Sequence, residues 1–428
     1  MANLDGCKTI EDFAGWLAGG LGRPTTKFIQ DMLSGIYTCR SVRLADVARA
    51  LGEPCDLHST RNRLSRNLAN TELATELSDR LLRQSAHSIK RDTRLIIRIH
   101  ALTKPDARKM QYLYKGAEDS ASEQPSSAMD SYKVCEIIAN NSGSRKYLPL
   151  LSTFWSRHAP DYVSDVDEIS RAIHRVLTMT NGRGIVFLDH PFVELPTLRE
   201  LIAELSDDAG VQFVARIEDD DTRLRYRKQS KTVSELAELC NARYACRIFK
   251  VLPERWVVTL PGQDEPDYQA LYQEIGSAAD GALAEHAIGM EYGSLAVRHH
   301  GSTRRLTLIV LKGELNSSLL TSLDSRRTRK SLLELIGSWF SIWEVVSAHL
   351  NVRDGFAPGD IGVMTYDRMQ LLLALLHTVV FFESRSYRLN NTLTRLQPHM
   401  GRKYHRDFLL PEDVERMESQ GKARNFRA

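Results

Sequence analysis

The chain has 428 residues, of which 42% are hydrophobic and 26% charged, a composition typical of a globular protein large enough for more than one packed unit. Its formal net charge of +3 excludes a chain that is strongly basic or acidic throughout. Arginine and lysine nevertheless gather toward the N-terminal region and near the C-terminus. Such basic segments fit a polyanion partner such as DNA, or else a solvated face.

Cysteine usage and hydropathy indicate the cellular compartment in which the protein works. The six cysteines form no CxxC pair and no Cys/His spacing suited to zinc, which indicates free thiols in a reducing environment. No signal-peptide pattern opens the sequence, and its most apolar run, 371–382, is shorter than the roughly 20 residues that span a bilayer. We therefore expect a cytoplasmic protein with no membrane segment.

Residues 1–90 are predicted to be helical throughout. Apolar side chains recur every three or four residues between Thr26 and Leu51, and Gly52 with Pro54 ends that pattern. Arginines cluster where one predicted helix ends and the next begins, so the region resembles a small helical DNA-binding unit. A plain helical bundle with exposed arginines is the alternative. The candidates for DNA contact are Arg40, Arg43, Arg61, Arg63 and Arg66.

Residues 91–250 alternate between strands and helices. Apolar runs bounded by turn residues predict strands, and apolar spacing near 3.6 predicts helices. The prediction is strands over 94–101, 131–141 and 146–156, a helix over 165–179, a strand over 182–192, a helix over 195–208 and a strand over 211–220. This order favours an α/β sheet with covering helices.

A basic stretch, 223–231, follows the last of these strands. Its Arg225, Arg227 and Lys228 are further candidates for phosphate contact. The following region alternates Val, Thr and Leu with polar residues, which predicts antiparallel strands, and 268–287 within it is more helical. Two long helices return afterwards, and the chain ends in a polar tail.

Several strings, taken together, are similar to DDE transposases of bacterial insertion sequences, in the branch called insertion-sequence family four. The resemblance runs from Phe28 to Phe382 and rests on the order and spacing of the strings. They are KPDARKMQYL, YLPLLSTFWSRHAPDYVSDVDEI, GIVFLDHPF, FVARI, SLLTSL and the helix that contains Glu344.

The resemblance implies an α/β fold with a ribonuclease H-like core, an N-terminal helical domain and a β-rich insertion. The domains that follow from it are a helical DNA-binding domain at 1–90, the first part of the core at 91–250, the insertion at 251–325, completion of the core with the Glu344 helix at 326–390, and a C-terminal tail at 391–428.

The resemblance also implies a two-metal site, and the first metal-holding position is changed here. The family holds two divalent cations through two aspartates and a glutamate, because hard cations prefer oxygen ligands. Aligned without gaps on the Lys104–Pro105 pair, the place of the first aspartate holds Arg98, and an aspartate common three residues later falls on Ala101. A shift by two would bring His100 to the place instead. An arginine repels a metal ion.

The other two acidic positions are kept. Asp189 matches the second aspartate and Glu344 the glutamate, so both are metal ligands if the site is active. The arginine and lysine that the family carries on the glutamate helix are replaced by Phe340 and Asn351. As alternatives, Asp189 could cap the helix predicted after it, and Glu344 could be an ordinary charged residue of an amphipathic helix.

The sequence therefore predicts a transposase-like protein that binds double-stranded DNA, works as a possible homodimer, needs no cofactor and has lost or weakened strand cleavage. Two alternatives stay open. One is an active DDE transposase that holds Mg or Mn through Asp189, Glu344 and a third ligand such as His100 or Asp119. The other is a protein-interaction scaffold. We also expect Arg98 to fill the place of the metal by an ion pair with Asp189 or Glu344.

Overall fold

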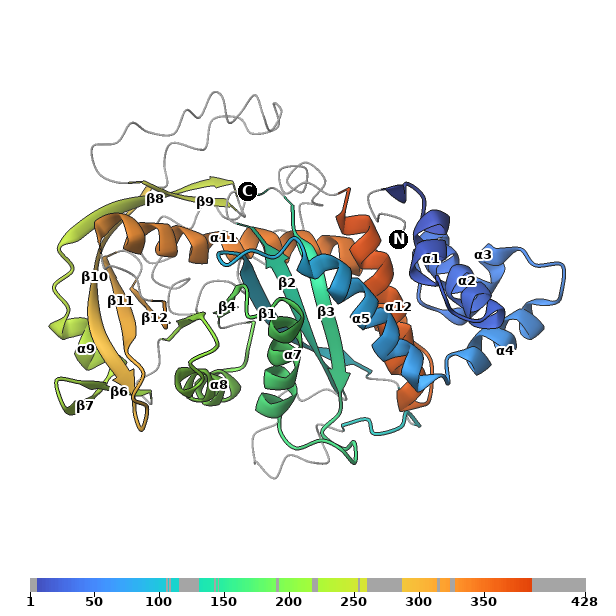
Figure 1. Cartoon of the computed structure of the whole chain (residues 1–428), viewed down its shortest axis with the longest axis horizontal. Helices are drawn as coiled ribbons and strands as arrows, with labels where there is room; N and C mark the ends of the chain where they lie inside the picture. Colours follow the sequence, from blue (N-terminus) through green and yellow to red (C-terminus); the bar gives the residue numbers. More distant parts are fainter. Residues whose placement is uncertain are drawn as a thin grey trace.

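A computed structural model describes most of the chain (Figure 1). The described residues are 6–386, apart from 105–106, 108, 115–130, 142–143, 145, 190–191, 218–221, 253–254, 260–286, 314–315 and 324–327.

The N-terminal region is a cluster of five helices. They are α1 (Ile10–Leu17), α2 (Arg23–Cys39), α3 (Leu44–Leu51), α4 (Leu57–Asn67) and α5 (Thr71–Ala86). Local sequence sets their ends: Thr9 and Asp12 form a capping box at the start of α1, and Asp56 caps α4. Gly52 ends α3 with a left-handed φ of 58°, a conformation that costs glycine little.

A mixed sheet forms the centre of the molecule. Its strands are β1 (Arg94–Thr103), β2 (Ser131–Asn140), β3 (Leu148–Trp155), β4 (Ile185–Leu188) and β5 (Phe213–Arg216), in the order β3-β2-β1-β4-β5. The first three pair antiparallel, whereas β4 runs parallel to both β1 and β5. The carboxyl ends of β1 and β4 therefore point toward the same edge of the sheet.

Helices cover both faces of this sheet, because its strands are apolar on both sides. Leu95 and Ile97 of β1 pack toward α7 (Asp165–Met179) and α8 (Leu195–Asp207). Ile96, between them, faces the other way and joins the core formed by α11 (Arg329–Asp354) and α12 (Tyr366–Ser384).

The sheet continues into further strands instead of ending at β5. The additional elements are β6 (Arg223–Tyr226), β7 (Gln229–Thr232), α9 (Val233–Leu239), β8 (Tyr244–Leu252), β9 (Arg255–Thr259), β10 (Ala287–His299), β11 (Leu306–Gly313), β12 (Ser317–Thr321) and the 3₁₀ turn η2 (Pro358–Asp360). β12 pairs with β5 and extends the order through β11, β10, β6 and β7. In Figure 1 these strands lie at one end of the molecule and the N-terminal helices at the other, with α11 running lengthwise above the sheet.

The α/β class and the predicted strands and helices of 91–250 are confirmed, with ends that differ by a few residues. The basic stretch 223–231 forms the β6–β7 hairpin. The helical segment predicted at 268–287 lies almost entirely outside the described residues, and the tail at 391–428 lies wholly outside them. Among the residues that the structure describes, no helix is long and apolar enough to cross a membrane. The domain boundaries stay predictions.

Candidate functional site

The middle of β1 carries basic residues, Arg98 and His100, at the place predicted for the first aspartate. Arg98 lies directly opposite Glu136 of β2 in the antiparallel ladder, and its Nη1 is 2.8 Å from Oε2 of Glu136. Arg98 thus has a partner on its neighbouring strand. The ion pair that we expected with Asp189 or Glu344 is not the one formed.

Glu136 is the centre of a buried ionic cluster. From α11, Nη1 of Arg353 lies 3.0 Å from its Oε2, and Nε2 of His349 lies 3.0 Å from its Oε1. Burial alone would raise the pKa of Glu136, but Arg353, His349 and His100 hold that pKa well below its usual range. Glu136 is therefore a buried carboxylate that joins β1, β2 and α11.

His100 completes the cluster next to the two arginines. Its Nδ1 is 2.7 Å from Nη1 of Arg98, and its Nε2 is 2.9 Å from Nη1 of Arg353. Burial, followed by Arg98 and Arg353, lowers the pKa of His100 well below its usual value. A neutral imidazole packed between two guanidinium groups is a poor place for a cation.

Asp189 lies just past the end of β4 and is 0% exposed. Its Oδ2 accepts a hydrogen bond of 3.1 Å from the indole Nε1 of Trp339 on α11. On its other side, Nε of Arg216 is 3.8 Å from Oδ1, and that guanidinium lies 5.6 Å from the centre of the Trp339 ring. These contacts connect the end of β4 with α11 and β5, and Asp189 does not cap α8, whose N-cap residue is Glu194.

These groups form a row of alternating charge across four strands. Arg98 faces Glu136, and it lies two residues beyond the last β1–β4 pair, Ile96 with Phe187, as Asp189 does. Arg216 and Asp189 each lie one residue beyond the last β4–β5 pair. The charges of Glu136, Arg98, Asp189 and Arg216 sum to zero, −1 + 1 − 1 + 1. We call these four residues the charge row.

Glu344 lies on a different side of α11 from the residue that binds Asp189. Trp339 and Glu344 are five positions apart, which is about 140° around a helix. Attraction by Glu344 acts on Arg94 at the start of β1, roughly 13 Å along the strand from Arg98. Burial still lowers the pKa of Arg94 to about 10. Where an active site would need Glu344, the helix presents aromatic side chains instead.

The remaining predicted positions do not complete a metal site. Phe340 is buried and packs on Trp339 with ring centres 4.5 Å apart, Asn351 is half-buried, and Ala101 is exposed. Asp119 lies outside the described residues. Within the described part of the chain, no group of three or more His, Cys, Asp or Glu side chains could hold a metal ion.

The ionic cluster predicts an acid-sensitive fold. His377 of α12 lines a 20 Å³ cavity beside Glu136, and burial, then His349, lower its pKa from 6.5 to about 4 although Glu136 opposes the shift. Between those two values the unfolded chain binds more protons than the folded one, so stability falls as the pH drops. The expected slope from this group is about 1.4 kcal/mol per pH unit. Glu136 adds to it, since its depressed pKa stabilises the fold above about pH 4.5 and that contribution is lost at lower pH.

This slope can be measured as the urea midpoint against pH. His377→Gln removes one titrating group and should flatten the curve between about pH 6.5 and 4. His58→Gln, at an exposed histidine of α4, is the matched control and should leave it unchanged. Equal slopes in all three proteins would contradict the assignment.

The arginines predicted to contact DNA divide into two groups. Arg40 pairs with Glu383 at 3.2 Å and stacks on Phe356, and Arg63 pairs with Asp31 and Glu53 at 2.8 and 2.9 Å, so both join elements of the fold. Others are exposed, and within the described residues their side chains make no ion pair. These are Arg61, Arg66, Arg225, Arg227 and Lys228.

A second basic feature lies across the inserted strands. Arg225 of β6 is directly opposite Arg298 of β10, and Arg305 immediately precedes β11, whose first residue, Leu306, pairs with Val297 of β10. All three side chains are exposed. We call Arg225, Arg298 and Arg305 the arginine row. Like charges opposite one another destabilise a sheet, so the arrangement favours a bound polyanion.

Sequence reasoning missed Glu136, His349, Arg353 and Arg216. The one signal available was that Glu136 is a charged residue inside the apolar stretch 134–139. An inward charge of this kind needs a partner. The partners come from elements more than a hundred residues away in some cases, such as α11, and no local pattern names them.

Comparison with known proteins finds a distant structural similarity. No protein-family model matches the sequence, and no curated protein matches it. Among solved structures, the chain is similar to the piggyBac transposase in a synaptic complex with hairpin DNA, seen by cryo-electron microscopy. The identity is 10%, the match covers 97% of this chain and 81% of that chain, and the TM-score is 0.36. At that level we infer neither the fold nor the function from it.

Proposed function

We propose that this protein binds double-stranded DNA on a transposase-like scaffold with a ribonuclease H-like core, and that it does not cut the DNA. The mixed sheet supports such a core, because β1 and β4 run parallel side by side. The positions of the family's two aspartates, Arg98 in the middle of β1 and Asp189 just past the end of β4, then lie the same two residues beyond the last β1–β4 pair. Pairing of two copies stays a prediction.

The single observation that carries the DNA-binding proposal is the arginine row. Three exposed arginines, two on the paired strands β6 and β10 and one just before β11, repel one another in the free protein. Phosphates spaced along a duplex would neutralise them and release counterions. The exposed Arg227 and Lys228 at the tip of the β6–β7 hairpin extend this surface.

The proposal that cleavage is lost rests on the charge row. A metal-binding carboxylate needs a free face toward the metal and a second carboxylate nearby. Asp189 is fully buried against Trp339 and Arg216, and Arg98 places a positive charge on the adjacent strand β1. A divalent cation there would replace stabilising contacts by repulsion from two guanidinium groups.

Binding and cleavage can be tested with the full chain. We expect retention on duplex DNA at about 50 mM salt, release as the salt is raised, and no nicking of supercoiled plasmid in Mg²⁺ or Mn²⁺. The double variant Arg225→Gln with Arg298→Gln should reduce the salt slope by about two, because each phosphate contact contributes about one. Lys330→Gln, at a lysine whose side chain is 87% exposed on α11, is the matched control for lost charge.

Two results would replace the proposal. Absence of retention at about 50 mM salt would remove DNA binding and favour a protein-interaction scaffold. Metal-dependent nicking that disappears in Asp189→Ala would establish an active transposase.

A further inference from the structure

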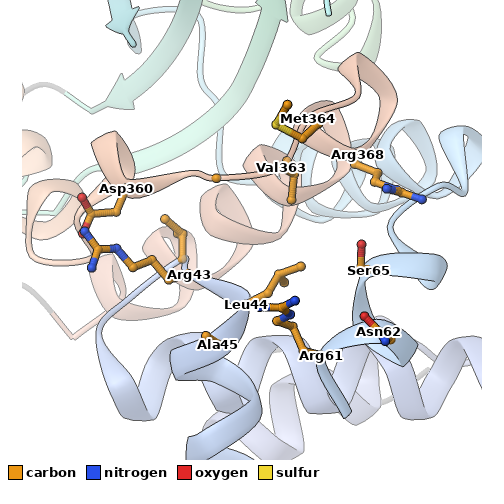
Figure 2. A pocket seen from close by; sticks show the side chains of 12 residues that line it. Arg43, Leu44, Ala45, Arg61, Asn62, Ser65, Asp360, Val363, Met364 and Arg368 are labelled. Atoms are coloured by element: carbon orange, nitrogen blue, oxygen red, sulfur yellow. The ribbon is translucent and has the colours of Figure 1, made fainter. Parts of the chain in front are cut away.

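A pocket of 390 Å³ lies between the N-terminal helices and the segment that joins α11 to α12 (Figure 2). One wall comes from the start of α3 and from α4, and the opposite wall from the turn η2 and the start of α12. The residues that line it are Val42, Arg43, Leu44, Ala45, Arg61, Asn62, Ser65, Asp360, Gly362, Val363, Met364 and Arg368.

The pocket carries a positive charge. Arg43, Arg61 and Arg368 line it together with one acid, Asp360, so its formal charge is +3 − 1 = +2. Asp360 forms an ion pair with Arg43, whose Nη2 lies 3.1 Å from Oδ2 of Asp360. Both side chains of that pair are substantially exposed, which makes it weak and easily rearranged. Figure 2 shows the Arg43–Asp360 pair on one side and Arg368 on the other.

Several polar side chains that line the pocket have hydrogen-bond donors without an acceptor among the described residues. Nε of Arg368 is buried and has no hydrogen-bond partner in the described part of the chain. The side chains of Arg61, Asn62 and Ser65 likewise make no hydrogen bond or ion pair with any described residue. A buried donor without an acceptor is costly, and an oxygen-rich ligand would satisfy it.

Two helices begin at the pocket, and neither is capped by the side chain of its own N-cap residue, although the first N–H of α12, that of Tyr366, donates to Oε1 of Gln111. Arg43 is the N-cap of α3 and Thr365 that of α12, and neither side chain accepts a hydrogen bond from its helix. The first turn of a helix leaves backbone N–H groups unpaired and carries partial positive charge, which attracts anions. Leu44 and Ala45, in the first turn of α3, line the pocket directly.

Lys104, the residue that follows β1, fixes the pocket wall opposite α3. Nζ of the buried Lys104 donates to the carbonyls of Gly359 and Ile361, at 2.7 and 2.6 Å. These bonds fix the turn that presents Asp360, Gly362 and Val363. A preformed site loses less entropy when it binds a ligand.

We propose that this pocket binds a backbone phosphate of the DNA, with Arg61 and Arg368 as its main ligands. The inference rests on the proposed function and deepens it, because it places one phosphate between the helical domain and the core. The chemistry is that of an oxygen-rich anion meeting guanidinium groups and two helix starts. Met364, which is 48% exposed, and Leu44 and Val363 provide an apolar wall suited to the adjoining sugar.

The test combines two probes on the full chain. The first is a duplex of about 20 base pairs, whose affinity is measured against salt concentration. The second is inorganic phosphate at about 20 mM, compared with chloride at equal ionic strength, with the melting temperature as readout. The variants are Arg61→Gln, at an exposed position, and Arg368→Gln. Arg83→Gln on α5, exposed and away from the pocket, is the control for lost charge.

We expect Arg61→Gln and Arg368→Gln each to weaken duplex binding roughly tenfold and to lower the salt slope by about one. Phosphate should raise the melting temperature of the unaltered protein and of Arg83→Gln, and less so that of either pocket variant. If Arg368→Gln melts at a lower temperature without phosphate, Arg61→Gln alone decides, since its exposed side chain supports no other contact.

Other outcomes separate this inference from the proposed function. Pocket variants that bind duplex as Arg83→Gln does would overturn the pocket assignment and leave DNA binding intact. Stabilisation by phosphate without any duplex binding would overturn the DNA assignment and with it the proposed function, since the pocket would then serve a free phosphate compound.

Discussion

Replacement of Glu136 by glutamine is expected to lower the free energy of unfolding by about 3–5 kcal/mol. Glu136 is the one carboxylate between Arg98 and Arg353, and glutamine has nearly its shape but no charge. Arg98 would then be buried without a counter-charge at this point, whereas Arg353 would keep only Asp354, 2.7 Å from its Nη2. Breaking a buried ion pair from one side costs far more than the net worth of the pair. Urea unfolding followed by circular dichroism measures the loss.

The control is Glu334→Gln on the same helix that supplies Arg353. Glu334 pairs with Lys330 at 3.9 Å, and both side chains are mostly exposed, so its loss should cost less than about 1 kcal/mol. The further change Arg98→Met in the Glu136→Gln background should recover part of the stability, because it removes the unpaired charge. A cost for Glu136→Gln no greater than that of the control would show that the cluster is not a structural hub.

Replacement of Asp189 by alanine should cost about 3 kcal/mol or more. The indole N–H of Trp339 would lose its acceptor, and Arg216 would lose a carboxylate 3.8 Å away, both in the interior. The prediction separates two roles for the same residue. A carboxylate kept for catalysis is often held at a cost to stability, so its removal leaves the fold unchanged or more stable.

The measurement is again the urea midpoint, with Asp207→Ala at the exposed end of α8 as control. Asp189→Asn should fall between the two, because its side-chain oxygen can still accept from Trp339. An Asp189→Ala protein as stable as the control would contradict this prediction and favour a role for Asp189 as a metal ligand.

The elements could be predicted from the sequence because their signals are local. The apolar run 94–101 and the helical spacing over 165–179 are each contained in one short window. The pairing of Arg98 with Glu136 could not, since it depends on the register of β1 against β2 after a long connection. Alternation alone says that a residue faces one side of a sheet, but not which residue it meets there.

The arginines of α4 illustrate the same limit. Thr60 and Leu64 mark the buried side of this helix, and Arg61 and Arg63 flank that side at similar angles. Only the position of Asp31 and Glu53, on other parts of the helical domain, decides that Arg63 forms an internal ion pair while Arg61 stays exposed. The sequence alone therefore identifies the candidate arginines, but it does not show which of them form internal ion pairs and which stay exposed.

The charge row also limits which residue position 98 can hold. Arg98 is ion-paired with Glu136 and, like Asp189, lies two residues beyond the last β1–β4 pair. A change of Arg98 to aspartate would place a third carboxylate among buried acids with no metal held, and the fold would lose stability. A carboxylate at position 98 therefore needs compensating changes at other positions, such as Arg216 and Trp339. In evolutionary terms, the residues of the charge row are expected to change together and not one at a time.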